Sequence, residues 1–402
     1  MTRRNQLHQM ILEHMDFTES ITDAELQEII YETLRAYGKK EYLSIEERIQ
    51  LSKELFNTFR RLDYIQELLE DDTITEIMVN GIHNIFVERE GRIEKLEQKF
   101  FSQSKLEDVI QQIVAGTNRM VNESSPIADA RLEDGSRVHI VLPPIAIDGP
   151  IVTIRKFPED SIHMEHLVKW GSITEEVVGL LKKLVLSKYN IFISGGTGSG
   201  KTTFLNALSE FIPKSERIIT IEDNAELQLK EIPNLVRLET RNPNVEGEGA
   251  ISIRDLIRAS LRMRPNRIIV GEVRGEEVVD MLMAMNTGHD GSLCTAHANT
   301  PIDMLSRLQT MVLMGLPGTP IVAIREQIAS AIDIMIHVGR LRDGSRKVLE
   351  ISEVVGCHNS EIQLMTLYRF KETGVLHEKI EGTLEYMNPL VHEEKLVAAG
   401  YQ

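Results

Sequence analysis

Along the chain the spacing of apolar residues changes twice, and each change predicts a different kind of element. Up to about residue 68, apolar positions recur at helical spacing among charges of alternating sign. Ser44 and Glu47 make a capping box, and Ile45 and Ile49 begin an apolar stripe. We therefore predict a helical bundle over residues 1–68, since alternating charges are typical of solvated helix faces and not of a nucleic-acid-binding segment.

Short alternating segments replace the helical period from about residue 69 onwards. TITEIMVNG and NIFVERE are separated by Asn80-Gly81, a pair that favours a tight hairpin turn, and a helical stretch and further strands follow. This order predicts a mixed α+β domain over residues 69–156. Residues 157–171 lack a strong period and are predicted to form a linker, which carries the only tryptophan, Trp170.

Buried strands that alternate with helices dominate residues 172–402. The apolar, β-branched runs are NIFIS, RIITI, NLVRLE, RIIVG and SLCTAH. Runs of this kind, separated by helical stretches, predict a parallel sheet and thus an α/β fold. A hairpin that turns at Asp343-Gly344 is expected near the end.

Composition narrows the function classes. Of the 402 residues, 42% are hydrophobic and 26% are charged, which is the profile of a globular protein. Lys and Arg number 45 against 61 Asp and Glu, so the net charge is −16 and an anionic ligand needs a local positive site. We therefore expect no nucleic-acid partner. Only Cys294 and Cys357 occur, consistent with a reducing cytoplasm, and no apolar run approaches the roughly 20 residues of a membrane span.

One glycine-rich stretch carries a specific chemistry. GGTGSGKTT fits G-x-x-x-x-G-K-[ST] between a predicted strand and a predicted helix, a context that a flexible linker does not require. Its backbone N–H groups would cradle phosphates, Lys201 would reach the β- and γ-phosphates, and the Thr202 hydroxyl would hold Mg²⁺. The predicted nucleotide-binding residues are Gly195, Gly196, Thr197, Gly198, Ser199, Gly200, Lys201, Thr202 and Thr203.

Carboxylates follow two of the other predicted strands. Glu272 ends RIIVGE, and Glu222 and Asp223 follow RIITI. Because carboxyl ends of parallel strands line the ligand crevice, either glutamate is a candidate to activate water. The residues leave this choice open, and we favour Glu272 as the residue that activates water, with Glu222 assisting. Glu272 would also hold Mg²⁺ through a water molecule. Asp223 is a secondary candidate.

The stretch TGHDGSLCTAHANTP contains two histidines. His297 ends a predicted strand beside the glycine loop and is expected to sense the γ-phosphate, with His289 as a secondary candidate. A metal site built from these histidines with Asp290 and Cys294 is disfavoured, since their spacing fits no usual zinc pattern. Structural roles for both histidines are the alternative.

In this order and after a mixed domain, the motifs resemble those of the type II/IV secretion ATPase superfamily. GGTGSGKTT is similar to its Walker A motif, TIEDNAEL to its Asp box, IIVGEVRG to its Walker B motif and TGHDGSLCTAHAN to its His box. DARLEDGSRVHIVLPPIAIDGPIVTIRKF together with MAMNTGHDGSLCTAHANTP looks most like the CpaF-like branch, the motors of tight-adherence (Tad) pili.

The resemblance implies a RecA-like ATPase domain over residues 172–402 that binds Mg²⁺ and ATP and works in a homo-hexameric ring. The ring would lie on the cytoplasmic face of an inner membrane, held there by platform proteins of a pilus or secretion machine. Arg137 and Arg155 stand where such motors carry arginines that reach the phosphates, with Arg131 a weaker candidate. The alternatives are a conjugation-type or nucleic-acid translocase ATPase on the same core, and a scaffold that binds ATP without hydrolysing it.

Overall fold

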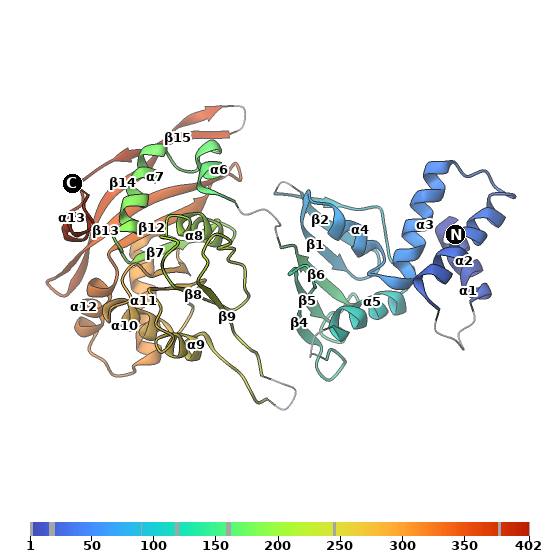
Figure 1. The fold of residues 1–402 in the computed structure, drawn as a ribbon, viewed down its shortest axis with the longest axis horizontal. Helices are drawn as coiled ribbons and strands as arrows, with labels where there is room; N and C mark the ends of the chain where they lie inside the picture. Colours follow the sequence, from blue (N-terminus) through green and yellow to red (C-terminus); the bar gives the residue numbers. More distant parts are fainter. Residues whose placement is uncertain are drawn as a thin grey trace. The chain divides into compact units, whose positions relative to one another are not determined.

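Two units make up the chain, Met1–Glu159 and Asp160–Gln402 (Figure 1). The computed structural model describes residues 3–15, 21–89, 91–116, 120–157, 162–243, 247–376 and 379–401. The buried hydrophobic side chains of each unit form clusters of their own, so each unit has its own core.

The first unit begins with helices α1 (Arg3–His14), α2 (Asp23–Tyr37), α3 (Ile45–Arg60) and α4 (Tyr64–Glu70). The predicted capping box at Ser44 and Glu47 is confirmed, since each side chain accepts a hydrogen bond from the backbone of the other. The predicted stripe is wrong at its start, because Ile45 and Ile49 are 78% and 67% exposed. Leu51 and Leu55 pack into the helical core instead. At 3.6 residues per turn, Leu51 lies about 200° around the helix from Ile49.

A sheet of six strands follows in the order β3-β2-β1-β6-β5-β4. The strands are β1 (Ile74–Asn80), β2 (Asn84–Arg89), β3 (Arg92–Lys95), β4 (Ile127–Arg131), β5 (Arg137–Val141) and β6 (Ile151–Arg155), and all pairs are antiparallel. Helix α5 (Gln103–Ala115) packs Leu106, Val109 and Ile110 into the same buried cluster as Ile77 and Ile154 of the sheet. An antiparallel sheet covered by a helix is the mixed α+β arrangement that the alternating segments indicate.

The stretch predicted as a linker, residues 157–171, contains a helix. Residues 158–161 lie outside the described ranges, and α6 (Met164–Lys169) follows them. Met164 and Leu167 are buried in the main cluster of the second unit, while Trp170 stays 56% exposed. This part of the stretch therefore belongs to the fold of the second unit.

The second unit is built on a nine-stranded sheet with the order β15-β14-β13-β12-β7-β11-β10-β8-β9. The strands from β12 to β9 in that order are parallel to one another, whereas β12 to β15 pair in antiparallel fashion. The parallel strands are β7 (Ile191–Gly195), β8 (Ile218–Glu222), β9 (Leu235–Glu239), β10 (Arg267–Val270), β11 (Leu293–His297) and β12 (Ile334–Arg340).

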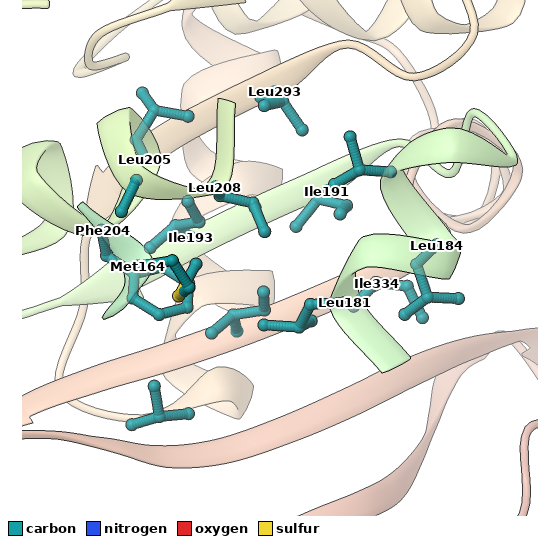
Figure 2. Close-up of a cluster of buried hydrophobic side chains, with 14 of the residues drawn as sticks. Met164, Leu181, Leu184, Ile191, Ile193, Phe204, Leu205, Leu208, Leu293 and Ile334 are labelled. Carbon is teal, nitrogen blue, oxygen red and sulfur yellow. The ribbon is translucent and has the colours of Figure 1, made fainter. Parts of the chain in front are cut away.

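Helices cover both faces of this sheet. They are α7 (Glu175–Leu186), α8 (Lys201–Ser209), α9 (Ile253–Ser260), α10 (Val278–Asn286), α11 (Pro301–Gly315) and α12 (Ile321–Ala331). Ile191 and Ile193 of β7 pack with α7 and α8 in one cluster (Figure 2), and Phe192 packs with α9 to α12 in the other. Because successive side chains of a strand point to opposite faces, β7 contributes to both cores. This arrangement confirms the predicted α/β fold.

The chain ends in an antiparallel extension of the sheet. Strands β13 (Arg346–His358), β14 (Glu361–Leu376) and β15 (Lys379–Tyr386) precede the short helix α13 (Glu394–Ala398). The predicted hairpin at Asp343-Gly344 is confirmed, since Arg340 pairs with Arg346 and Gly344 has a positive φ of 84°. None of the helices within the described ranges combines the length and apolar character that crossing a bilayer requires.

Candidate nucleotide-binding site

The glycine loop joins the central strand β7 to helix α8. Gly198 and Gly200 have φ values of 68° and 91°, a region that favours glycine. Gly195 must also lack a side chain, because a Cβ there would clash with the carbonyl oxygen of Val338 on β12. The turn therefore presents its backbone N–H groups and the start of α8 on one side, which is the form of a phosphate cradle.

Lys201, the first residue of α8, lies over this loop. Its Nζ donates a hydrogen bond of 2.9 Å to the carbonyl oxygen of Gly196 and lies 3.2 Å from Nδ1 of His297. Burial lowers the pKa of Lys201, and the carboxylate of Glu272 opposes this effect. The ammonium group is thus held inside the curve of the loop, where the phosphates of a nucleotide would bind.

His297 connects the lysine to a carboxylate. It ends β11 and is paired in register with Gly195 at the end of β7. Its Nε2 lies 3.1 Å from Oε1 of Glu272. Burial, and then the positive charge of Lys201, lower the pKa of His297, which favours the neutral ring. A neutral ring that accepts from Lys201 at Nδ1 donates from Nε2 to Glu272.

Glu272 also binds an arginine that the sequence analysis did not single out. Nε of Arg274 lies 3.1 Å from Oε1 of Glu272, and its Nη2 lies 3.4 Å from Oε2. The same guanidinium approaches Oδ2 of Asp223 at 3.7 Å. Hydrogen bonding to Glu272 raises the pKa of Arg274, which favours the charged guanidinium. The feature of the sequence that could have indicated this residue is the arginine of GEVRG, two residues after the candidate base.

Glu222 is buried behind this group, at the end of β8. Its Oε2 accepts hydrogen bonds of 2.8 and 2.9 Å from the backbone N–H groups of Glu226 and Leu227. Burial raises its pKa to about 7, against the opposing effect of these two hydrogen bonds. Its other oxygen has no hydrogen-bond partner among the described residues. Gly271 leaves room for it, since a Cβ there would lie 2.9 Å from Cγ of Glu222.

A cavity of about 490 Å³ opens beside the loop. Helix α11 contributes Asp303 and Arg307 to its wall. Neither residue was predicted from the sequence, although they stand one turn apart after SLCTAHANT. The remaining lining residues are Gly196, Thr197, Glu272, Arg274, His297, Ala298 and Asn299. Cations and carboxylates thus face one space next to a phosphate cradle, an arrangement that fits a nucleotide. Thr202 follows Lys201 on α8, so its hydroxyl would hold Mg²⁺ directly, and the Glu272 carboxylate would hold it through a water molecule.

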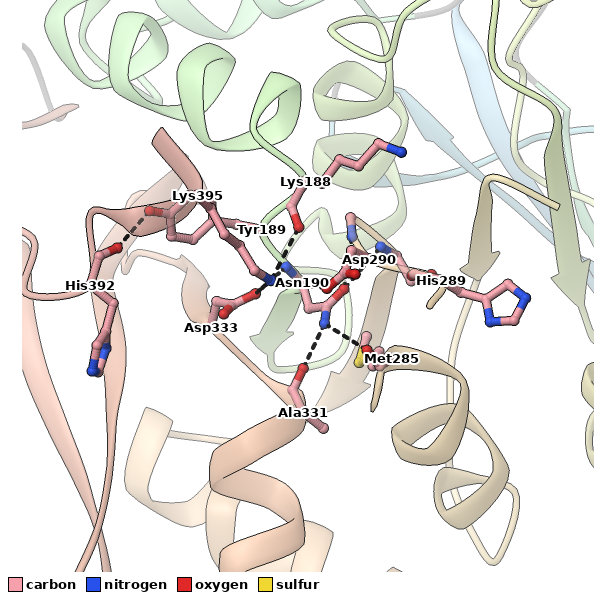
Figure 3. Close-up of polar contacts among 12 residues, drawn as sticks. Lys188, Tyr189, Asn190, Met285, His289, Asp290, Ala331, Asp333, His392 and Lys395 are labelled. Carbon is pink, nitrogen blue, oxygen red and sulfur yellow. Dashed lines mark hydrogen bonds and ion pairs between the residues drawn. The ribbon is translucent and has the colours of Figure 1, made fainter. Parts of the chain in front are cut away.

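His289 lies elsewhere. It precedes β11, at the edge of the sheet where the parallel strands begin, whereas the glycine loop lies where they end. There Asn190 binds the turn through its Oδ1, which accepts from the N–H groups of Gly291 and Ser292. Its Nδ2 donates to the carbonyl oxygens of Met285 and Ala331 (Figure 3). The structure thus brings His297 to the loop of its own chain and does not bring His289 there.

The three candidate arginines lie in the first unit, and the sheet places them in one row. Arg131 of β4 pairs with Arg137 of β5, and Arg137 pairs with Arg155 of β6. Residues directly opposite on antiparallel strands have Cβ atoms about 5 Å apart, so three guanidinium groups start from neighbouring positions on one face. The sequence named these residues separately, and strand register brings them together.

Comparison with known proteins gives several similarities. The family described as Type II/IV secretion system protein matches residues 60–395. A putative conjugal transfer protein of Mycobacterium tuberculosis H37Rv is 34% identical over 310 residues, which cover 76% of this chain and 87% of that protein. The conjugal transfer protein TrbB of Rhizobium radiobacter is 32% identical over 305 residues, with 75% and 90% covered. The pilus retraction motor PilT, solved with bound ADP, has a similar fold, with a TM-score of 0.53 and 21% identity over 84% of this chain and 88% of that one.

Proposed function

The chain belongs to the type II/IV secretion system protein family, and on this basis we propose that it is a hexameric motor that uses Mg²⁺-dependent ATP hydrolysis to drive pilus assembly or type II/IV secretion. It is an ATPase of this family. The observation that carries the proposal is the continuous set of contacts from Lys201 through His297 to Glu272 beside the glycine loop.

Each residue of this set has a role that its position supports. Residues 195–203, among them Lys201, bind the phosphates. Thr202, and Glu272 through a water molecule, would hold Mg²⁺, which would neutralise phosphate charge. Glu272 orients the attacking water and accepts its proton. Glu222 assists from behind, since a carboxyl with a pKa of about 7 exchanges protons readily near neutral pH.

His297 reports the γ-phosphate. It contacts both the phosphate-binding lysine and the candidate base, so a change in charge at the γ-position alters both of its partners. Asp223 acts on Glu272 through Arg274, whose guanidinium group approaches both carboxylates. His289 is not included in this role, because it lies at the other edge of the sheet.

The row of Arg131, Arg137 and Arg155 supplies positive charge to the transition state. Negative charge develops during phosphoryl transfer, and residues outside the glycine loop can stabilise it. An arginine from another domain or subunit is a common source of the stabilising positive charge. We infer that these arginines act on the nucleotide within a homo-hexameric ring, with movement of the first unit relative to the second as the mechanical output.

The similarity of residues 129–157 and 283–301 to the CpaF-like branch favours a Tad pilus motor, bound at the cytoplasmic face of an inner membrane by platform proteins. A conjugation motor is the second candidate, favoured by the names of the 34% and 32% identical relatives. Deleting the gene in its host distinguishes them. Loss of surface pili with normal plasmid transfer supports the first candidate, and the converse result supports the second. DNA-stimulated ATP hydrolysis with salt-sensitive DNA binding would also favour conjugation.

A further inference from the structure

An arginine outside every recognised motif contacts the glycine loop. Arg346 begins β13, and its Nε donates a hydrogen bond of 2.8 Å to the carbonyl oxygen of Gly198. The hairpin of β12 and β13 brings it there: β12 runs beside β7 as far as the pair Val338 and Gly195, and the chain then turns back. The contact is therefore a consequence of sheet register, across 148 residues of sequence.

The fit between this side chain and the loop is close. Cδ of Arg346 lies 3.3 Å from the position that a Cβ on Gly200 would occupy, so its aliphatic part lies along the open side of that glycine. Nε is engaged by Gly198, and no acceptor among the described residues takes a hydrogen bond from the Nη groups. The side chain is exposed, so these two donor groups are available to a ligand on the loop.

The order of the sheet decides which part of a nucleotide they face. β12 and β11 flank β7 on opposite sides, so Arg346 reaches the loop from one side and His297 from the other. In the proposed function, His297 and Glu272 lie on the γ-phosphate side of the site. The loop itself cradles the α- and β-phosphates, which ATP and ADP share.

We propose that Arg346 is a further nucleotide-binding residue, which fixes the loop through Gly198 and donates from its Nη groups to the phosphates that ATP and ADP have in common. The proposal rests on the proposed function of the site. In a chain with a net charge of −16, a cation beside the loop also offsets the repulsion of a polyanionic ligand. A planar guanidinium suits this task, because it can bind backbone carbonyl and phosphate oxygens at once.

Equilibrium binding of fluorescent ADP and of a fluorescent non-hydrolysable ATP analogue to the full chain tests this proposal. Arg346→Ala should weaken both ligands by a similar factor, about tenfold at low salt, as expected for loss of a charge-assisted hydrogen bond. The factor should decrease at high salt. Arg346→Lys keeps the positive charge but loses the planar guanidinium group with its two Nη donors. Its affinity for both nucleotides should therefore lie between those of the wild type and Arg346→Ala.

Arg342→Ala is the matched control, because Arg342 is an exposed arginine of the same hairpin region that pairs with Glu372 instead. It should bind both ligands like the wild type. Equal affinities in Arg346→Ala and Arg342→Ala would overturn the assignment of Arg346, as would a loss confined to the ATP analogue. A wild-type chain that binds neither ligand would overturn the proposed function together with this inference.

Discussion

Glu222→Gln should make the stability of the second unit less dependent on pH. The carboxyl is 3% exposed, and its pKa is raised to about 7 from an ordinary value of 4.5, chiefly by burial. Between these two values the folded chain holds a proton that the unfolded chain has released. Stability contributed by the protonated carboxyl is therefore present below pH 4.5 and is lost as the pH rises through 7.

The magnitude follows from the two pKa values. A tenfold difference in proton affinity corresponds to about 1.4 kcal/mol, so the full effect is about 3 kcal/mol. About 2 kcal/mol of it falls between pH 5.5 and pH 8.5. Glutamine has the same shape, can keep the hydrogen bonds from the N–H groups of Glu226 and Leu227, and does not ionise in this range. When the pH rises from 5.5 to 8.5, the free energy of unfolding of Glu222→Gln should thus increase by about 2 kcal/mol relative to that of the wild type.

Urea unfolding at pH 5.5 and 8.5, followed by Trp170 fluorescence, measures this difference, because the single tryptophan lies in the second unit. Glu381→Gln removes an exposed carboxylate of β15 and is the control, for which little relative change is expected. If Glu222→Gln and the wild type lost the same stability between the two pH values, the burial argument would be refuted.

Three further predictions concern turnover, each measured by phosphate release at saturating ATP. Glu272→Gln should lower kcat at least about a hundredfold and more than Glu222→Gln does, since only Glu272 lines the cavity; the reverse order would make Glu222 the main base. His297→Ala should lower kcat while leaving ADP affinity within about twofold, because the ring contacts the proposed base Glu272; weakened ADP binding would speak against the proposed sensor role. Arg137→Ala and Arg155→Ala should each lower kcat by about a hundredfold or more, and normal turnover in both variants would exclude the arginine row from the site.

Local patterns in the sequence were sufficient for much of the fold. The sheet of the second unit was predictable because its buried strands are short β-branched runs. The glycine loop was predictable because the spacing of its glycines and lysine between a strand and a helix is typical of phosphate binding and is not needed in a linker. The position of His297 beside the loop also followed from strand order. The positions of the glycine loop and of His297 could be predicted because both follow from the direction of a strand and from the residues at its carboxyl end.

Features that depend on register or on distant packing were not predictable. Helix α6 was missed because its few apolar residues show no clear period, and its burial comes from contacts with the second unit. His289 stands eight residues before His297, and the sequence alone does not say that β11 separates them across the sheet. Arg346 reaches Gly198 only through the turn at Asp343-Gly344 and the pairing that follows it.

The central claim is that residues 195–203 bind ATP for hydrolysis, and phosphate release by the purified full chain with Mg²⁺ and ATP tests it most directly. The wild type should release phosphate continuously and should stop when EDTA removes Mg²⁺. Lys201→Ala should show no turnover above background, because its ammonium group is held inside the loop by the Gly196 carbonyl and beside His297. Normal phosphate release by Lys201→Ala would contradict the account.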